Sequence, residues 1–296
     1  MFRHELYLGE PACQEAYTLL LVTPVLRSIR VYPVKSMRGC EVPESEVERW
    51  GLRDDRRWAL LNPDGSRLSA REDRRMLSLS ARPTPDGGVR LASCDGSWID
   101  VDPPVDGELV PTSISRLAVM RLAAPLVHEW VSGQLSRSVR LAWLDDPTRR
   151  PVSPAHGGLD GEPLSLADAG PLLMTSETSL RQVDEWVAES PEDRDRPRDP
   201  IAMTRFRPNV VVEGIATAFA EDGWTRVRIG AVTFRQAEQC DRCMMTMIDP
   251  ETLAQGKETL RSLARHRRRD GKVWFGIRLV PETVGRIHVG DPITPS

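Results

Sequence analysis

Turn-forming residues recur so often in the first half of the chain that only short elements fit between them. Clusters of proline, asparagine, aspartate and glycine occur at residues 62–65, 83–88 and 95–96. The runs between them are rich in β-forming residues: Ser28–Tyr32 alternates with a period of two, and Arg57–Leu61 ends at the first cluster. Short strands spaced in this way predict a β-barrel or a β-sandwich.

A few segments carry the spacing of amphipathic helices instead. Apolar residues recur at helical intervals in Pro125–Leu135, where the proline stands early, at a position that helices tolerate. A second helix is predicted with Thr178 or Ser179 as its cap, and a third over Glu258–His266. The rest of the second half returns to strands, which we expect at 209–212, 225–229, 232–235, 274–280 and 286–289.

The length of 296 residues favours two domains, since a domain averages about 150 residues. Residues 145–163 contain four prolines and a Gly-Gly pair, which indicates a linker or a crossing loop. Residues 1–25 show no clean period and are interpreted as a loose extension. We therefore expect one domain at 26–150 and another at 151–296. The predicted fold class is α+β, mainly β, with two β-barrel-like domains and peripheral helices.

Charge and composition exclude several classes of protein. The formal net charge is −3, so no excess of charge points to nucleic acid or to an anionic membrane. The apolar stretch Tyr17–Leu26 is shorter than the roughly 20 residues that span a bilayer, and the residues before it are acidic, unlike a signal peptide. Five cysteines form an odd, sparse set that does not suit a disulfide scaffold. We expect a cytoplasmic protein with reduced thiols.

Cys240 and Cys243 form a C-x-x-C pair just past a predicted strand. A zinc site of four cysteines needs a second pair, which the sequence does not contain, and His266 and His288 lack finger spacing. A thioredoxin-type pair opens a helix in a βαβ unit, whereas this half is rich in β-strands. Taken alone, the pair could also be two thiols without a function. The surrounding sequence must therefore decide between these interpretations.

Several separated segments form a combination more specific than any one of them. In chain order they are Val31–Gly39, Gly51–Trp58, Ser69–Glu72, Asp168–Leu173, Arg205–Val210, Cys240–Cys243, Asp249–Thr252 and Val289–Pro292. Together they closely resemble the MOSC family, named for the C-terminal domain of molybdenum cofactor sulfurase, preceded by its MOSC N-terminal β-barrel domain. The resemblance extends over Val25–Ile293 and points to the mitochondrial amidoxime-reducing component and its bacterial counterparts. It assigns 26–150 to the N-terminal β-barrel domain and 151–296 to the MOSC domain.

The resemblance implies a molybdenum atom held by one molybdopterin and one protein cysteine in a cleft between the domains. The family's ligand falls on Cys243, and a thiolate is a soft donor suited to a metal that changes oxidation state. The positions implied to contact the cofactor, Mo-molybdopterin, are Lys35, Ser36, Arg71, Ala169, Gly170, Arg207, Asn209 and Arg242. Relatives in the reductase branch carry hydroxyl residues where this chain has Ala169 and Gly170, so backbone donors would have to substitute there.

The implied activity is the reduction of N-hydroxylated compounds, such as hydroxylamino-purines and amidoximes, to amines. The expected partners are a small-molecule substrate and a separate electron donor, a ferredoxin or a flavoprotein, with neither nucleic acid nor a membrane. An alternative is a carrier of the cofactor, or of sulfur as a persulfide on Cys243, without turnover. A third hypothesis is a nucleic-acid binder that uses the arginine-rich run 265–269, although cations at the end of a helix are common without such a role.

Overall fold

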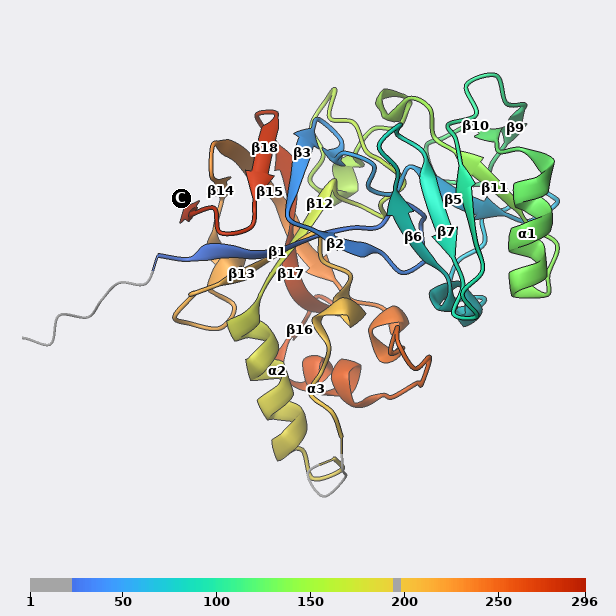
Figure 1. Cartoon of the computed structure of the whole chain (residues 1–296). Helices are drawn as coiled ribbons and strands as arrows, with labels where there is room; N and C mark the ends of the chain where they lie inside the picture. The colour runs from blue at the N-terminus through green and yellow to red at the C-terminus, as the bar shows by residue number, and fades with distance from the viewer. Residues whose placement is uncertain (1–22, 194–197) are drawn as a thin grey trace, which may run out of the picture.

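The computed structural model describes residues 23–193 and 198–296, so the expected loose extension lies outside the described residues up to position 22. In the first half the strands are β1 (Val25–Val31), β2 (Cys40–Val42), β3 (Glu44–Glu48), β4 (Gly51–Leu52), β5 (Trp58–Leu61), β6 (Ser80–Pro83), β7 (Val89–Ala92), β8 (Trp98–Val101), β9 (Leu109–Pro111), β10 (Val119–Leu122) and β11 (Arg140–Trp143). In the second half they are β12 (Leu172–Ser176), β13 (Val210–Glu213), β14 (Arg226–Ile229), β15 (Val232–Asp241), β16 (Arg268–Arg269), β17 (Lys272–Pro281), β18 (Gly285–His288) and β19 (Ile293–Pro295). The helices are α1 (Pro125–Leu135), α2 (Glu177–Glu189) and α3 (Glu258–His266) (Figure 1).

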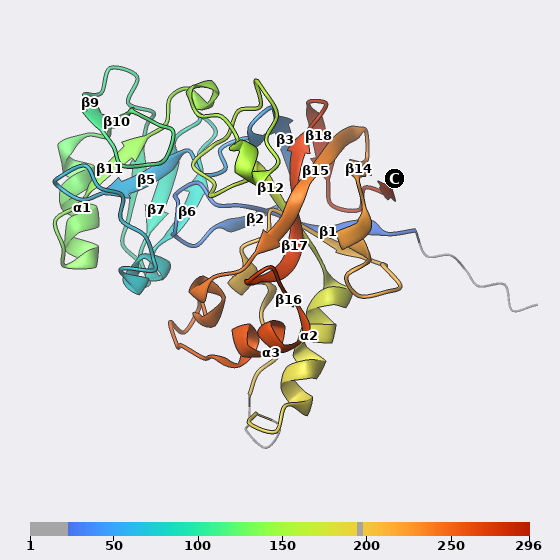
Figure 2. The ribbon, with the colours of Figure 1, turned by 180° about the vertical axis from the view of Figure 1, so that it is seen from behind.

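A large sheet joins the two halves of the chain. Its order is β19-β14-β15-β17-β12-β13-β1-β2, with β16 beside β17. β1 pairs antiparallel to β13, with Ile29 opposite Val210, and β18 pairs with β3. Figure 2 shows β15 and β17 crossing the middle of the second half. Strand pairing therefore crosses the division predicted near residue 150, while the division itself stays a prediction.

The first half builds its own core around two smaller sheets. These have the orders β5-β11-β10-β9 and β6-β7-β8, and α1 packs against β11 at the outer end of the molecule (Figure 1). Trp58, Leu60, Met76 and Val131 are buried together there. Each such side chain contributes about 1.5–3 kcal/mol when it is fully buried. The predicted α+β, mainly β fold is confirmed, with its helices at the periphery.

The helix predictions are confirmed, and one of them needs a correction at its start. α1 and α3 have the predicted bounds, but α2 is capped by Ser176 rather than by Thr178 or Ser179. The Ser176 hydroxyl accepts a hydrogen bond from the Ser179 N–H at 3.0 Å. The other two hydroxyls bond elsewhere: Thr178 donates to the Ile215 carbonyl, and Ser179 donates to buried Glu221.

The strand before the cysteine pair is longer than the sequence predicts. The sequence predicts a strand that ends at residue 235, yet β15 pairs with β17 as far as Asp241, with register shifts near Glu238 and near Gln239. This stretch is polar, and bulges at the register shifts interrupt the strict alternation of side chains. The sequence pattern therefore does not reveal the last part of the strand. Cys240 thus lies inside the strand, and Cys243 lies just beyond it.

Helices α2 and α3 pack on each other below the large sheet (Figure 1). Phe206 and Phe275 are fully buried beside them, with stacked rings whose centroids are 4.0 Å apart. This packing fixes the 3₁₀ turn Met203–Phe206, and the next residue, Arg207, leaves the turn toward the first half of the chain. The aromatic core therefore positions an arginine between the two halves.

Candidate functional site

A pocket lies between the two halves of the chain and is lined by residues of both. All nine residues that the sequence proposed for the site line it: Lys35, Ser36, Arg71, Ala169, Gly170, Arg207, Asn209, Arg242 and Cys243. Residues far apart in the sequence thus meet at one place. Their individual roles remain predictions.

Positive charge dominates the lining of this pocket. Among its described lining residues, seven are basic and two are acidic; the basic ones are Lys35, Arg56, Arg67, Arg71, Arg207, Arg242 and Arg278. The acidic ones are Asp168 and Asp241. Cations gathered in a partly enclosed space create a potential that favours an anionic ligand.

Lys35 lies deep in this wall, with 8% of its surface exposed. Its ammonium donates to the Leu166 carbonyl at 2.7 Å and to Asp168 Oδ1 at 2.5 Å. Burial lowers its pKa from 10.5 to about 8, against the opposing effect of Asp168. Arg71 lies at the rim and reaches Asp168 Oδ2 at 3.3 Å. The charge of Lys35, and to a smaller extent that of Arg71, holds the pKa of Asp168 well below its usual range.

Arg207 is partly buried and reaches from the second half of the chain to the loop that follows Lys35. It donates to the Met37 carbonyl at 2.8 Å and lies over the ring of Tyr32, 4.3 Å from its centroid. Burial lowers its pKa to about 10. Its Nη2 is buried and finds no hydrogen-bond partner in the described parts of the chain. An uncompensated guanidinium nitrogen of this kind favours a ligand that accepts hydrogen bonds.

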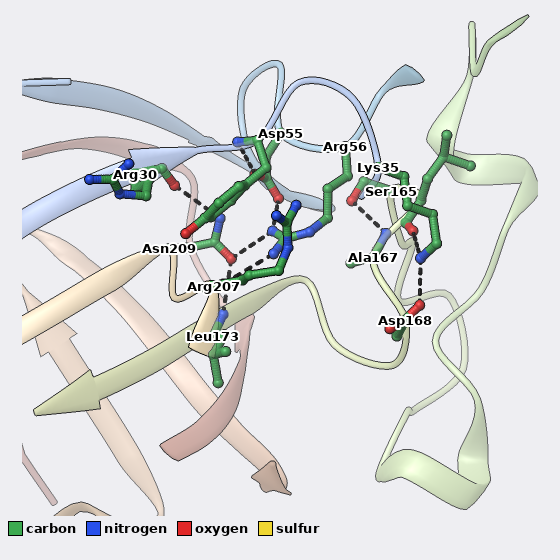
Figure 3. Close-up of polar contacts among 12 residues, drawn as sticks. Arg30, Lys35, Asp55, Arg56, Ser165, Ala167, Asp168, Leu173, Arg207 and Asn209 are labelled. Carbon is green, nitrogen blue, oxygen red and sulfur yellow. Dashed lines mark hydrogen bonds and ion pairs between the residues drawn. The ribbon is translucent and has the colours of Figure 1, made fainter. Parts of the chain in front are cut away.

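Asn209 ties the walls of the pocket together (Figure 3). Its Oδ1 accepts from Arg56 Nη1 at 3.0 Å and from the Leu173 N–H at 3.1 Å, and its Nδ2 donates to the Arg30 carbonyl at 3.2 Å. Arg56 also donates to the carbonyl of Arg207. Because these bonds use most of its hydrogen-bonding capacity, Asn209 offers a ligand only its second amide hydrogen.

Among the described residues, nine non-glycine residues have a positive φ, and three of them line the pocket. Ser36, Arg56 and Arg207 have φ values of 71°, 51° and 55°, in the left-handed region that non-glycine residues seldom adopt. Each costs of order 1 kcal/mol or more, and such residues gather at binding sites where the surrounding structure holds them.

The loop that carries Ala169 and Gly170 packs closely against Arg278 of β17. A Cβ on Gly170 would lie 2.8 Å from the Arg278 Cβ. Arg278 lines the pocket and is bound to Glu238 and to Asp241, the latter at 2.6 Å. The missing side chain at position 170 therefore makes room for Arg278.

The two thiols of the C-x-x-C pair have different surroundings. Cys240 is buried, and its Sγ accepts a hydrogen bond from Arg242 Nη1 at 2.9 Å. Cys243 is exposed at the start of the turn Met244–Met247, and the Thr246 N–H and hydroxyl both bond to its carbonyl, at 3.1 and 3.0 Å. The backbone of Cys243 is thus fixed while its thiol opens onto the pocket.

The described residues offer no site for a metal held by protein side chains alone. Within residues 23–193 and 198–296, no group of three or more His, Cys, Asp or Glu side chains could hold a metal ion. The zinc reading of the cysteine pair therefore lacks ligands. A metal bound at Cys243 would need its remaining ligands from a cofactor, and the surplus of cations fits an anionic one.

Arg56, Arg67 and Arg278 belong to the pocket although the sequence did not single them out. Arginine makes up 37 of the 40 basic residues, so composition gives no signal for any of them. Only Arg278 carries a sequence signal, because this charged residue interrupts an apolar run in β17 and the residues on either side of it are buried. A charged residue in such a position needs partners or a site.

The arginine-rich run at 265–269 is partly engaged in ion pairs within the molecule. Arg265 binds Glu192, and Arg267 binds Asp222 and lies over the Phe219 ring. Two of the four arginines of the run thus form ion pairs, while Arg268 and Arg269 are exposed. No helix within the described residues is both long and apolar enough to cross a membrane.

The fold and the pocket together define a class of protein. The family described as MOSC N-terminal beta barrel domain matches residues 23–138, and the MOSC domain matches residues 161–294. The chain belongs to the family of MOSC-domain proteins that carry this N-terminal barrel, and the predicted resemblance is confirmed.

The chain is also similar to individual proteins with known names. The chain is 30% identical to mitochondrial amidoxime-reducing component 1 of Mus musculus, over 89% of this chain and 79% of that protein. It is 30% identical to the protein of the same name in Homo sapiens, over 93% of this chain and 84% of that one. It is also 28% identical to molybdenum cofactor sulfurase of Oryza sativa subsp. japonica, of which it spans 35%.

Proposed function

We propose that the pocket binds Mo-molybdopterin, with Cys243 as the protein ligand of the molybdenum, and that the protein reduces N-hydroxylated compounds to amines. The observation that carries this proposal is an exposed thiol, Cys243, opening onto a pocket with seven basic and two acidic described lining residues. The names of the relatives support both the molybdenum cofactor and the reductase activity.

The residues present fit the group. Lys35 and Arg71 lie together at one side and suit a terminal phosphate, with Ser36 as a further hydroxyl donor. Arg207, with its buried Nη2 free of partners among the described residues, suits an acceptor on the heterocycle. The backbone at Ala169 and Gly170 and the guanidinium of Arg242 complete the proposed donor set.

When bound, the cofactor supplies two-electron chemistry at its metal. Overall, the N–O bond of the substrate is replaced by an N–H bond and the oxygen leaves as water, which consumes two electrons and two protons. The proposed electron source is a separate ferredoxin or flavoprotein. The chain contributes a fixed Cys243 backbone, an exposed thiol and a charged wall that orients the ligand.

The alternative is a carrier that holds the cofactor, or a persulfide on Cys243, without turnover. The similarity to molybdenum cofactor sulfurase and the exposure of Cys243 favour this candidate. It predicts a bound cofactor or bound sulfur but no amine product.

Turnover separates the two functions. We expect the full chain, produced in a host that makes molybdopterin, to convert an N-hydroxylated base to its amine with a reduced viologen as donor. Cys243→Ala should lose this activity by at least a hundredfold, whereas Cys94→Ala, which changes an exposed cysteine outside the pocket, should keep it. Loaded wild-type protein that forms no amine would contradict the reductase and support the carrier.

A further inference from the structure

Asp168 contacts two cations of the first half that line the pocket, Lys35 and Arg71. Its Oδ1 lies 2.5 Å from Lys35 Nζ, and its Oδ2 lies 3.3 Å from Arg71 Nη2. The Asp168 side chain is 58% exposed, whereas that of Lys35 is 9% exposed, so the carboxylate lies on the open side of the pair. We infer that Asp168 is an internal counter-ion that competes with an anionic ligand, a phosphate, for Lys35 and Arg71.

The backbone around Asp168 is held independently of its carboxylate. Buried Arg150 donates to the carbonyls of Ser165 and Ala167, and Lys35 donates to the carbonyl between them, that of Leu166 (Figure 3 shows Lys35 beside this loop). These bonds fix the loop up to the residue before Asp168. An incoming phosphate therefore needs only a rotation of one exposed side chain to take its place.

A counter-ion has a clear physical purpose at this position. Arg67 and Arg150 act on Lys35 in the same direction as burial and disfavour its charged form, and Asp168 acts against them. Asp168 therefore favours the charged form of Lys35, and a phosphate in its place would favour that form in the same way. The same contact weakens phosphate binding, because a ligand gains only the difference between its own interactions and those of the carboxylate.

Asp241 provides a matched control within the same pocket. It is the other acidic lining residue among those described, but it pairs with Arg278 at 2.6 Å and not with Lys35 or Arg71. Asp168→Asn and Asp241→Asn each remove one negative charge from the pocket. Only the first variant removes a competitor from the two cations, so the pair separates direct competition from a general change of charge.

Isothermal titration of the full chain with inorganic phosphate tests the inference, using protein from a host that makes no molybdopterin. We expect Asp168→Asn to bind phosphate at least tenfold more tightly than the wild type, and Asp241→Asn to change the affinity less than threefold. Equal or weaker binding by Asp168→Asn would overturn the inference, as would equal gains in both variants. The inference rests on the proposed function only for the choice of phosphate, and a failure of molybdenum binding would leave this result unaffected.

Lys35 itself gives a second readout that requires no variant. Lysine occurs only at positions 35, 257 and 272, and the latter two are exposed, so each molecule carries its own controls. Phosphate in contact with Lys35 should slow acylation of its amine several-fold relative to the other two, as followed by mass spectrometry. In Asp168→Asn the same slowing should need at least tenfold less phosphate. An acylation ratio that phosphate does not change would place the anion elsewhere and refute the competition.

Discussion

Lys35 shows what burial does to a single side chain in this protein. Its ammonium is almost enclosed, and burial lowers its pKa from 10.5 to about 8 although Asp168 lies in contact. The unfolded chain therefore binds more protons than the folded chain between these pH values, so this group makes the fold more stable as the pH rises through that window.

Lys35→Met should remove this pH dependence. Between pH 8 and pH 10 we expect the wild type to gain about 2 kcal/mol of unfolding free energy relative to the variant, since each pKa unit corresponds to about 1.4 kcal/mol. Urea unfolding of both proteins at the two pH values measures the difference. Parallel pH profiles would show that Lys35 is not held in a desolvated position.

At the level of elements, the sequence predicted what local patterns encode. Helices α1 and α3 followed from their apolar spacing. Seven of the nineteen strands within the described residues were predicted by position, namely β1, β5, β13, β14, β15, β17 and β18. The cap of α2 and the end of β15 did not, because both depend on partners distant in the sequence: Glu221 engages Ser179, and β17 pairs with the polar part of β15.

The sequence likewise predicted some of the pocket residues and missed others. Cys243 and the eight proposed contact residues came from motifs, and the fold brings all of them to one pocket. Arg56 and Arg67 could not be separated from other arginines by pattern alone, because their place in the wall depends on loops of the first half meeting strands of the second.

The loop Asp168–Gly170 packs against β17 so closely that a side chain at position 170 should disturb the contact. Gly170→Ala would place a Cβ 2.8 Å from the Arg278 Cβ and 3.2 Å from its Cδ. We expect a loss of about 1–3 kcal/mol of unfolding free energy from this overpacking. Molybdenum content should fall as well, because Arg278 must move.

Gly133→Ala is the matched control for this substitution. Gly133 lies in α1, and a Cβ there meets no heavy atom within 4 Å, so alanine should leave stability unchanged or raise it by up to about 1 kcal/mol. Chemical denaturation of both variants gives the comparison. If Gly170→Ala is as stable as Gly133→Ala, the loop does not pack against Arg278 as described.

For the whole molecule, the essential feature is that neither half contains the site. Lys35 and Arg71 come from the first half, and Arg207 and Cys243 come from the second. The halves are joined by the pairing of β1 with β13 and of β3 with β18, and by the bonds of Arg56 and Arg207 across the pocket. A ligand bound between them contacts both halves and should stabilise their association.

The molybdenum content of the purified full chain tests the central claim most directly. In protein from a host that makes molybdopterin, elemental analysis should find close to one molybdenum per wild-type chain and almost none in Cys243→Ala. Cys240→Ala should retain most of the metal, because its thiol is buried against Arg242 while that of Cys243 opens onto the pocket. Equal molybdenum in the two cysteine variants, or none in the wild type, would contradict the account.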